Sequence, residues 1–130
     1  MVLVDTSVWI DHFNGANNTN TDLLKSAIDE AEDIGTCGIV CMEILQGIRK
    51  ERDLSLIRSI LDDLLYLPEQ RSTYVTAADM YRHLRKKGVT IRKPVDCIIA
   101  ALCLECSAFL LHNDRDFEMI SRHFPLQRYT

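Results

Sequence analysis

Four acidic residues, all in a similar local setting, are the part of this sequence best suited to chemistry. Asp5 and Asp114 each follow a short apolar run, and Glu43 and Asp96 each lie in the first turn of a predicted helix. In a parallel α/β sheet the turns from strand to helix face one edge, so the four carboxylates are expected to meet there. Any one of them alone is equally well explained as a helix-capping or dipole-stabilising acid.

Carboxylates that converge on one cleft repel each other. Two charges ~4 Å apart repel by about 4 kcal/mol at an effective dielectric of ~20, so such a cluster takes up protons or binds cations. Oxygen ligands at an edge open to solvent suit Mg²⁺ or Mn²⁺ better than Zn²⁺. The sequence has no glycine-rich phosphate loop and no Ser/His/Asp arrangement. The predicted reaction is therefore metal-assisted hydrolysis of a phosphodiester.

The elements expected to position these acids are strands that alternate with helices. Apolar runs predict strands at 2–4, 36–40, 64–68 and 108–111, with a final edge strand at 126–129. Helical periodicity follows the first strand and continues at 22–32, 42–48, 53–65, 69–87, 95–106 and 115–122, while 14–21 is expected to be a loop. This order predicts a three-layer α/β/α sandwich with a central parallel sheet of four to five strands. Residues 1–130 are expected to form a single domain.

Composition narrows the setting of the protein. The chain has 130 residues, 47% of them hydrophobic, and a net charge of −4. We expect a soluble, cytoplasmic protein, because no run is long enough to span a membrane and no secretory signal pattern is present. Five cysteines in apolar runs are typical of reduced, buried thiols. A zinc site from Cys37, Cys41, Cys103 and Cys106 is the alternative, disfavoured because neither pair lies on a glycine-rich knuckle.

A basic stretch lies near the third acid, although the chain as a whole is acidic. Its candidate contacts to RNA phosphates are Arg82, Arg85, Lys86, Lys87, Arg92 and Lys93. The alternative is an ordinary solvated helix face.

Four short stretches carry a resemblance to a known family. They are VDTSVWID at 4–11, MEILQG at 42–47, PVDCIIAA at 94–101 and NDRDF at 113–117. In order and spacing they resemble the motifs of PIN-domain ribonucleases, above all the VapC-type toxins of toxin–antitoxin pairs. The resemblance implies an endoribonuclease that hydrolyses RNA, with transfer RNA one candidate substrate. It also implies a homodimer and inhibition by a cognate antitoxin.

The resemblance also implies roles for particular residues. Asp5, Glu43, Asp96 and Asp114 would be catalytic acids that bind Mg²⁺ or Mn²⁺, Asp116 would be an auxiliary metal-binding acid, and Thr6 or Ser7 would order the site. Two positions depart from the pattern. His112 replaces a usual Ser or Thr, which would change a hydrogen bond or add a pH-sensitive group, and Cys41 leaves the helix of Glu43 without a polar cap.

Two other functions compete with the nuclease. One is a metal-binding PIN fold that acts as a non-catalytic partner-binding or repressor module. In either case Trp9 and Phe13 are candidates to line a groove for the helix of an antitoxin partner, and the alternative for Trp9 is the core. The other is a phosphoryl-accepting receiver domain, which is disfavoured because its acceptor Asp and its Lys cannot both be placed.

Overall fold

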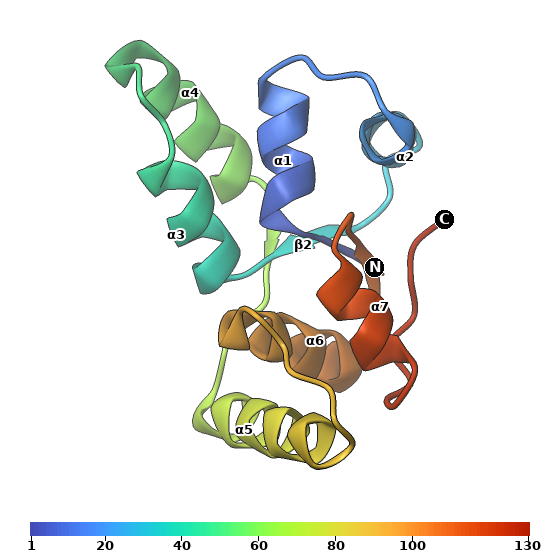
Figure 1. The fold of residues 1–130 in the computed structure, drawn as a ribbon. Coiled ribbons are helices and arrows are strands. Elements are labelled where there is room, and N and C mark those ends of the chain that lie inside the picture. Colours follow the sequence, from blue (N-terminus) through green and yellow to red (C-terminus); the bar gives the residue numbers. More distant parts are fainter.

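A parallel sheet of four strands forms the centre of the protein, whose computed structural model describes residues 1–130 (Figure 1). The strands are β1 (Val2–Val4), β2 (Ile34–Thr36), β3 (Leu65–Tyr66) and β4 (Phe109–Leu111). They are arranged in the order β3-β2-β1-β4, and all three pairings are parallel. The three residues of β1 are at most 1% exposed, as expected for a strand with both faces covered.

Seven helices cover this sheet. They are α1 (Thr6–Phe13), α2 (Thr19–Asp29), α3 (Gly38–Gln46), α4 (Glu51–Asp62), α5 (Arg71–Lys86), α6 (Pro94–Cys106) and α7 (Arg115–Ser121). Helices α1 to α4 lie on one side of the sheet, and α5 and α6 lie on the other with α7 beside α6 (Figure 1). The predicted three-layer α/β/α sandwich is thus confirmed, with four strands in the sheet. None of the seven helices has the length and apolar character needed to cross a membrane.

Helix α6 is the most deeply buried helix of the chain. Pro94 occupies its first position, where the missing N–H costs nothing. The whole run from Ile99 to Cys103 is at most 1% exposed, so the helix packs on nearly every side. It ends at Ser107, a left-handed residue with φ of 52°. This agrees with the prediction, and it places Asp96 in the first turn of a helix surrounded by apolar side chains.

Several predicted boundaries were wrong, because contacts that are not apparent from hydrophobic periodicity decide them. The loop expected at 14–21 ends early, since the side chains of Asn18 and Thr21 form a capping box that starts α2 at Thr19. The edge strand expected at 126–129 is reduced to a single bridge between Leu110 and Arg128. Within α5, helical periodicity predicts that Tyr74 faces inward, but its side chain is 46% exposed, and Met80 is buried in the core.

The start of α3 is the correction that matters most for the site. The apolar run at 36–40 predicts a strand, but β2 ends at Thr36 and α3 begins at Gly38. The carboxylate of Glu69, from the connection before α5, accepts hydrogen bonds from the backbone N–H groups of Gly38 and Ile39 at 2.8 and 3.3 Å. This distant cap starts the helix early and puts Glu43 in its second turn rather than its first.

Candidate metal-binding active site

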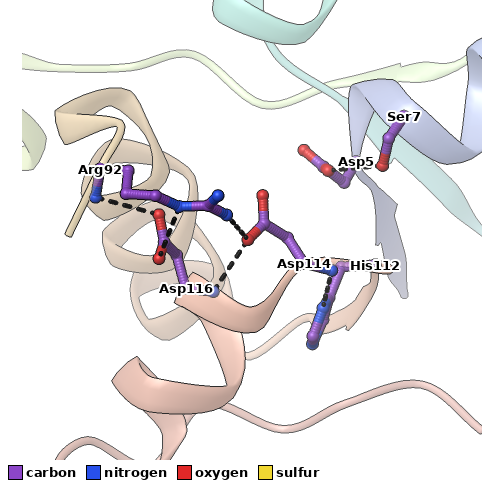
Figure 2. A network of polar contacts seen from close by, with 6 residues as sticks. All are labelled: Asp5, Ser7, Arg92, His112, Asp114 and Asp116. Carbon is purple, nitrogen blue, oxygen red and sulfur yellow. Dashed lines mark hydrogen bonds and ion pairs between the residues drawn. The ribbon is translucent and has the colours of Figure 1, made fainter.

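Asp5 lies between β1 and α1, where the sheet edge opens (Figure 2). Its backbone N–H bonds to the carbonyl of Leu111 at 2.9 Å, which fixes the turn against β4. The hydroxyl of Ser7 donates to Asp5 Oδ2 at 3.0 Å, and the Asp5 side chain caps no helical N–H. The structure therefore contradicts a pure capping role, because this carboxylate faces the space between the elements.

Glu43 approaches Asp5 from α3. The hydroxyl of Thr6 donates to Glu43 Oε1 at 2.9 Å, across 37 positions of the chain. Thr6 and Ser7 thus each donate a hydrogen bond to a different one of the predicted site acids. This contact links α1 to α3 at the sheet edge. Thr6 is buried there and Glu43 is half-buried.

Asp96 is the most buried of the four acids, at 4% exposure. Its Oδ2 atom is buried and has no hydrogen-bond partner. Burial, together with the negative charges of Asp5 and Asp114, raises the pKa of Asp96 to about 7, and the charge of Lys93 opposes that rise. A carboxylate oxygen left unpaired in such a place is costly unless a proton or a cation meets it.

Asp114 caps α7 and faces the same space as Asp5 (Figure 2). Its Oδ1 atom accepts the backbone N–H of Asp116 at 2.8 Å, so the predicted cap is real. Single ligand atoms of Asp96, Asp114 and Asp116 all lie within 4.8 Å of one another. Asp114 is thus both a helix cap and a member of the acidic cluster.

The electrostatics of the cluster favour a bound cation. Burial raises the pKa of Asp5 above its usual value, and the nearby charges of Glu43 and Asp114 raise it further. The donor set is oxygen only, and one buried oxygen of Asp96 has no partner. These residues therefore fit a hard dication such as Mg²⁺ or Mn²⁺.

The cysteines form no such site. All five are free thiols, and the four considered for zinc are not brought together with their ligand atoms close. Burial raises the pKa of Cys37 to about 12 and that of Cys97 to about 11, which keeps both thiols protonated at neutral pH.

His112, which replaces the usual Ser or Thr, forms a hydrogen bond through its ring and does not titrate near neutral pH. Its Nδ1 atom accepts the backbone N–H of Asp114 at 3.1 Å, and its ring packs 5.0 Å from that of Phe117. Burial, with the charge of Arg128, lowers the pKa of His112 to about 4. The ring is therefore neutral at pH 7, and it holds the turn that carries Asp114.

The basic stretch divides into two parts. Arg92 lies on the acidic cluster, with Nη2 3.4 Å from Asp114 Oδ1 and Nε 3.6 Å from Asp116 Oδ1 (Figure 2). Lys93 is close enough to Asp96 to oppose the rise in its pKa. The remaining four, Arg82, Arg85, Lys86 and Lys87, are exposed toward the end of α5. The hydrophobic pattern of the sequence does not indicate that Arg92, unlike the other basic residues, contacts Asp114 and Asp116.

Glu69 was missed by the sequence reasoning, because a cap supplied from 30 positions away leaves no local signal. We predict that Glu69→Ala lowers the free energy of unfolding by about 1 kcal/mol, since α3 loses a charged cap at its N-terminus. Glu69→Gln should cost less, because an amide oxygen still accepts one hydrogen bond. Urea unfolding measures both variants. An unchanged midpoint for Glu69→Ala would show that the cap does not stabilise α3.

The sequence of this chain matches a known protein family. Residues 2–122 match the family profile described as PIN domain. The chain belongs to the PIN-domain family. It is 32% identical over 129 residues to the VapC ribonuclease Mb1587 of Mycobacterium bovis, covering 98% of this chain and 96% of that protein. Ribonuclease VapC11 of Mycobacterium tuberculosis matches to the same extent.

Solved structures share the fold of this PIN domain. A crystal structure of VapBC2 from Rickettsia felis, bound to a DNA fragment from its promoter, aligns with a TM-score of 0.77 at 20% identity, and the alignment covers 100% of both chains. VapBC from Salmonella typhimurium bound to DNA aligns with a TM-score of 0.70 at 19% identity, over 98% of this chain and 94% of that one. At these identities the likeness establishes the fold, and the PIN assignment agrees with it.

Proposed function

We propose that this PIN domain is a metal-dependent endoribonuclease and the toxin of a toxin–antitoxin pair. The relatives at 32% identity align over nearly their whole length, and both are named as ribonucleases. The observation that carries the proposal is the gathering of acids near Asp96, whose buried Oδ2 has no partner. Asp114 and Asp116 lie with it in one 4.8 Å group, and the charge of Asp5 helps to raise its pKa. A merely structural set of helix caps would not leave that oxygen unpaired.

Asp5, Asp96 and Asp114 would hold the cation, with Glu43 completing the negative charge around it. A bound Mg²⁺ or Mn²⁺ supplies an activated water and charge neutralisation at the phosphate. Ser7 and Thr6 hold the carboxylates of Asp5 and Glu43 by their hydroxyls, so these acids are oriented before the substrate arrives. His112 keeps the Asp114 turn in place through the backbone N–H of Asp114.

RNA would run across the exposed basic end of α5. We predict that Lys86→Gln with Lys87→Gln weakens RNA binding and reduces the salt dependence of log K by about 1.4, because each single-strand phosphate contact contributes a slope of about 0.7. Filter binding of a short RNA to the Asp5→Asn background, at several salt concentrations, measures this. Arg52→Gln with Arg58→Gln on α4 is the control. An unchanged slope for the Lys86 and Lys87 pair would contradict the assignment.

An antitoxin would bind the groove between α1 and α4. The groove encloses about 680 Å³, and its apolar lining comprises Ile10, Phe13, Ile48, Leu56, Ile57 and Ile60. Leu56 is 64% exposed there, whereas Trp9 is only 1% exposed and belongs to the core, stacked on Phe13 at 5.5 Å. The similar solved structures include a toxin–antitoxin complex from Klebsiella pneumoniae and VapBC and FitAB assemblies, which supports a protein partner.

This groove gives a direct test of the partner. We predict that Leu56→Glu weakens binding of the proposed antitoxin, to be sought in the neighbouring open reading frame, by at least about tenfold, because a charge would replace an anchor in an apolar groove. RNA cleavage should persist, since Leu56 lies away from the acids. Co-purification and cleavage are measured on the same preparation. Full retention of the partner would place its binding elsewhere.

A homodimer is also part of the proposal. The face formed by α5 and α6 carries an apolar hollow of about 370 Å³ that includes Tyr74, Ala77, Tyr81, Val95 and Ile98. Tyr74 is 46% exposed and Val75, on the same helix, is 55% exposed. A second copy of the chain would cover these side chains.

Incubation of the purified protein with total cellular RNA tests the proposed function. With Mg²⁺ we expect discrete fragments, and their mapped ends would identify the substrate. A chelator and Asp5→Asn should each remove the fragments. If a folded protein that binds Mg²⁺ gives no fragments, the non-catalytic partner-binding module would be the better account.

A further inference from the structure

Both oxygens of Asp116 are already engaged by a single residue. The backbone N–H of Arg92 donates to Asp116 Oδ2 at 3.1 Å, and Arg92 Nε lies 3.6 Å from Asp116 Oδ1 (Figure 2). Asp116 is 5% exposed, so water cannot readily replace these contacts. Each carboxylate oxygen of Asp116 thus has a contact to a nitrogen of Arg92.

Asp116 and Asp96 therefore differ, although ligand atoms of both lie in one 4.8 Å group. Asp96 has a buried oxygen without a partner, whereas Asp116 has a partner for each oxygen. A cation that approached Asp116 would share the carboxylate with Arg92, because a donor of Arg92 already contacts each of its two oxygens. Within the cluster, Asp96 therefore has an oxygen free to bind a cation, whereas the carboxylate of Asp116 already binds Arg92.

Arg92 is fixed at one end and open at the other. Ile91, its neighbour, is 2% exposed and anchors the connection, and the backbone of Arg92 is held by Asp116. Its guanidinium also reaches Asp114 Oδ1 at 3.4 Å, yet the side chain is 70% exposed. Nη1 has no ion-pair or hydrogen-bond partner, so its N–H groups face solvent beside the acids.

We propose that Asp116 is the positioning residue for Arg92 rather than a cation ligand, and that the Arg92 guanidinium contacts a non-bridging oxygen of the phosphate being cleaved. A guanidinium presents paired donors in a fixed plane that matches a phosphate, and two acids already set that plane here. The inference rests on the proposed function, because it specifies how the same site contacts its substrate.

Cation affinity separates the two roles of the acids. Mn²⁺ titrated into Asp116→Asn and Arg92→Ala, followed by electron paramagnetic resonance, should bind within about threefold of the wild-type affinity. Asp96→Asn should lose at least about tenfold, because it lacks a ligand oxygen. If Asp116→Asn loses Mn²⁺ as Asp96→Asn does, Asp116 is a ligand and the proposal is wrong.

Cleavage of a short single-stranded RNA tests the phosphate contact. Arg92→Ala should lower kcat by about 10- to 100-fold, as expected when one charge-stabilising donor is lost. Asp116→Asn should lower it similarly, and the double variant should be no slower than Arg92→Ala alone. Arg92→Lys should recover part of the rate, and added guanidinium at low concentration should partly restore Arg92→Ala. Arg58→Ala is the matched control.

Two results would overturn the contact. One is losses that multiply in the double variant, and the other is an Arg92→Ala rate that guanidinium cannot restore. Because Arg92 is exposed, its variants test the contact even if Asp116→Asn fails to fold. If the wild type cleaves no RNA, the proposed function fails by itself. Mn²⁺ affinity and RNA binding would still test this inference, since Arg92→Ala and Asp116→Asn should then weaken RNA binding equally.

Discussion

Asp96→Asn should slow RNA cleavage by at least about a hundredfold while leaving the protein folded. Asp96 offers the buried oxygen that has no protein partner, so its loss removes the best-prepared ligand of the cation. Asparagine keeps the shape of the side chain but not its charge. Cleavage of an end-labelled RNA at saturating Mg²⁺ gives the rate.

The control for this prediction is Asp79→Asn. Asp79 is exposed on α5 and takes part in no ion pair, so its variant should cleave at the wild-type rate. If Asp96→Asn retained more than about a tenth of the wild-type rate, a role for Asp96 in holding the cation would be contradicted.

Asp96→Asn should also be more stable than the wild type when metal is removed. Near pH 8 the folded wild type must hold Asp96 charged, although burial and neighbouring acids raise its pKa from 3.8 to about 7. Removing that charge should raise the free energy of unfolding by roughly 1–3 kcal/mol. Near pH 4 the folded wild type carries Asp96 protonated, so the difference between variant and wild type should become small.

The sign follows from proton binding. Between pH 4 and 7 the folded state keeps a proton on Asp96 that the unfolded state has lost, so the contribution of Asp96 to stability falls as pH rises. His112 acts in the opposite direction, because its pKa falls from 6.5 to about 4 on folding. The measured quantity is therefore the difference between variant and wild type at each pH, taken from urea unfolding in chelator. A difference that does not grow with pH would contradict the raised pKa of Asp96.

Saturating Mg²⁺ should reverse this order of stability. A cation that binds only the folded state stabilises the wild type by mass action, whereas Asp96→Asn should gain much less. A variant that gains as much from Mg²⁺ as the wild type would show that the cation binds away from Asp96.

Much of this architecture could be predicted from the sequence because its strongest signals are local. The apolar run of β1, the proline at the first position of α6 and the acids after β1 and β4 each determine a strand end or a helix start directly. Those signals placed Asp5, Asp96 and Asp114 at the correct ends of their elements. The parallel order of the sheet then brought these acids to one edge.

The parts that could not be predicted depend on contacts between distant segments. The start of α3 depends on Glu69, and the hydrogen bond from Thr6 to Glu43 joins two helices. The engagement of Asp116 by Arg92 spans 24 positions. Neither periodicity nor capping preference contains such pairings, because they depend on how the elements pack.

The most direct test of the central claim follows Mn²⁺ binding and RNA cleavage on one preparation. If the acids hold the cation that cleavage requires, the rate should rise with Mn²⁺ occupancy and reach half its maximum at half-saturation. Asp96→Asn should shift both curves together to higher Mn²⁺ concentration. Cleavage that continues in excess chelator, or a rate that does not follow occupancy, would contradict a metal-dependent ribonuclease at this site.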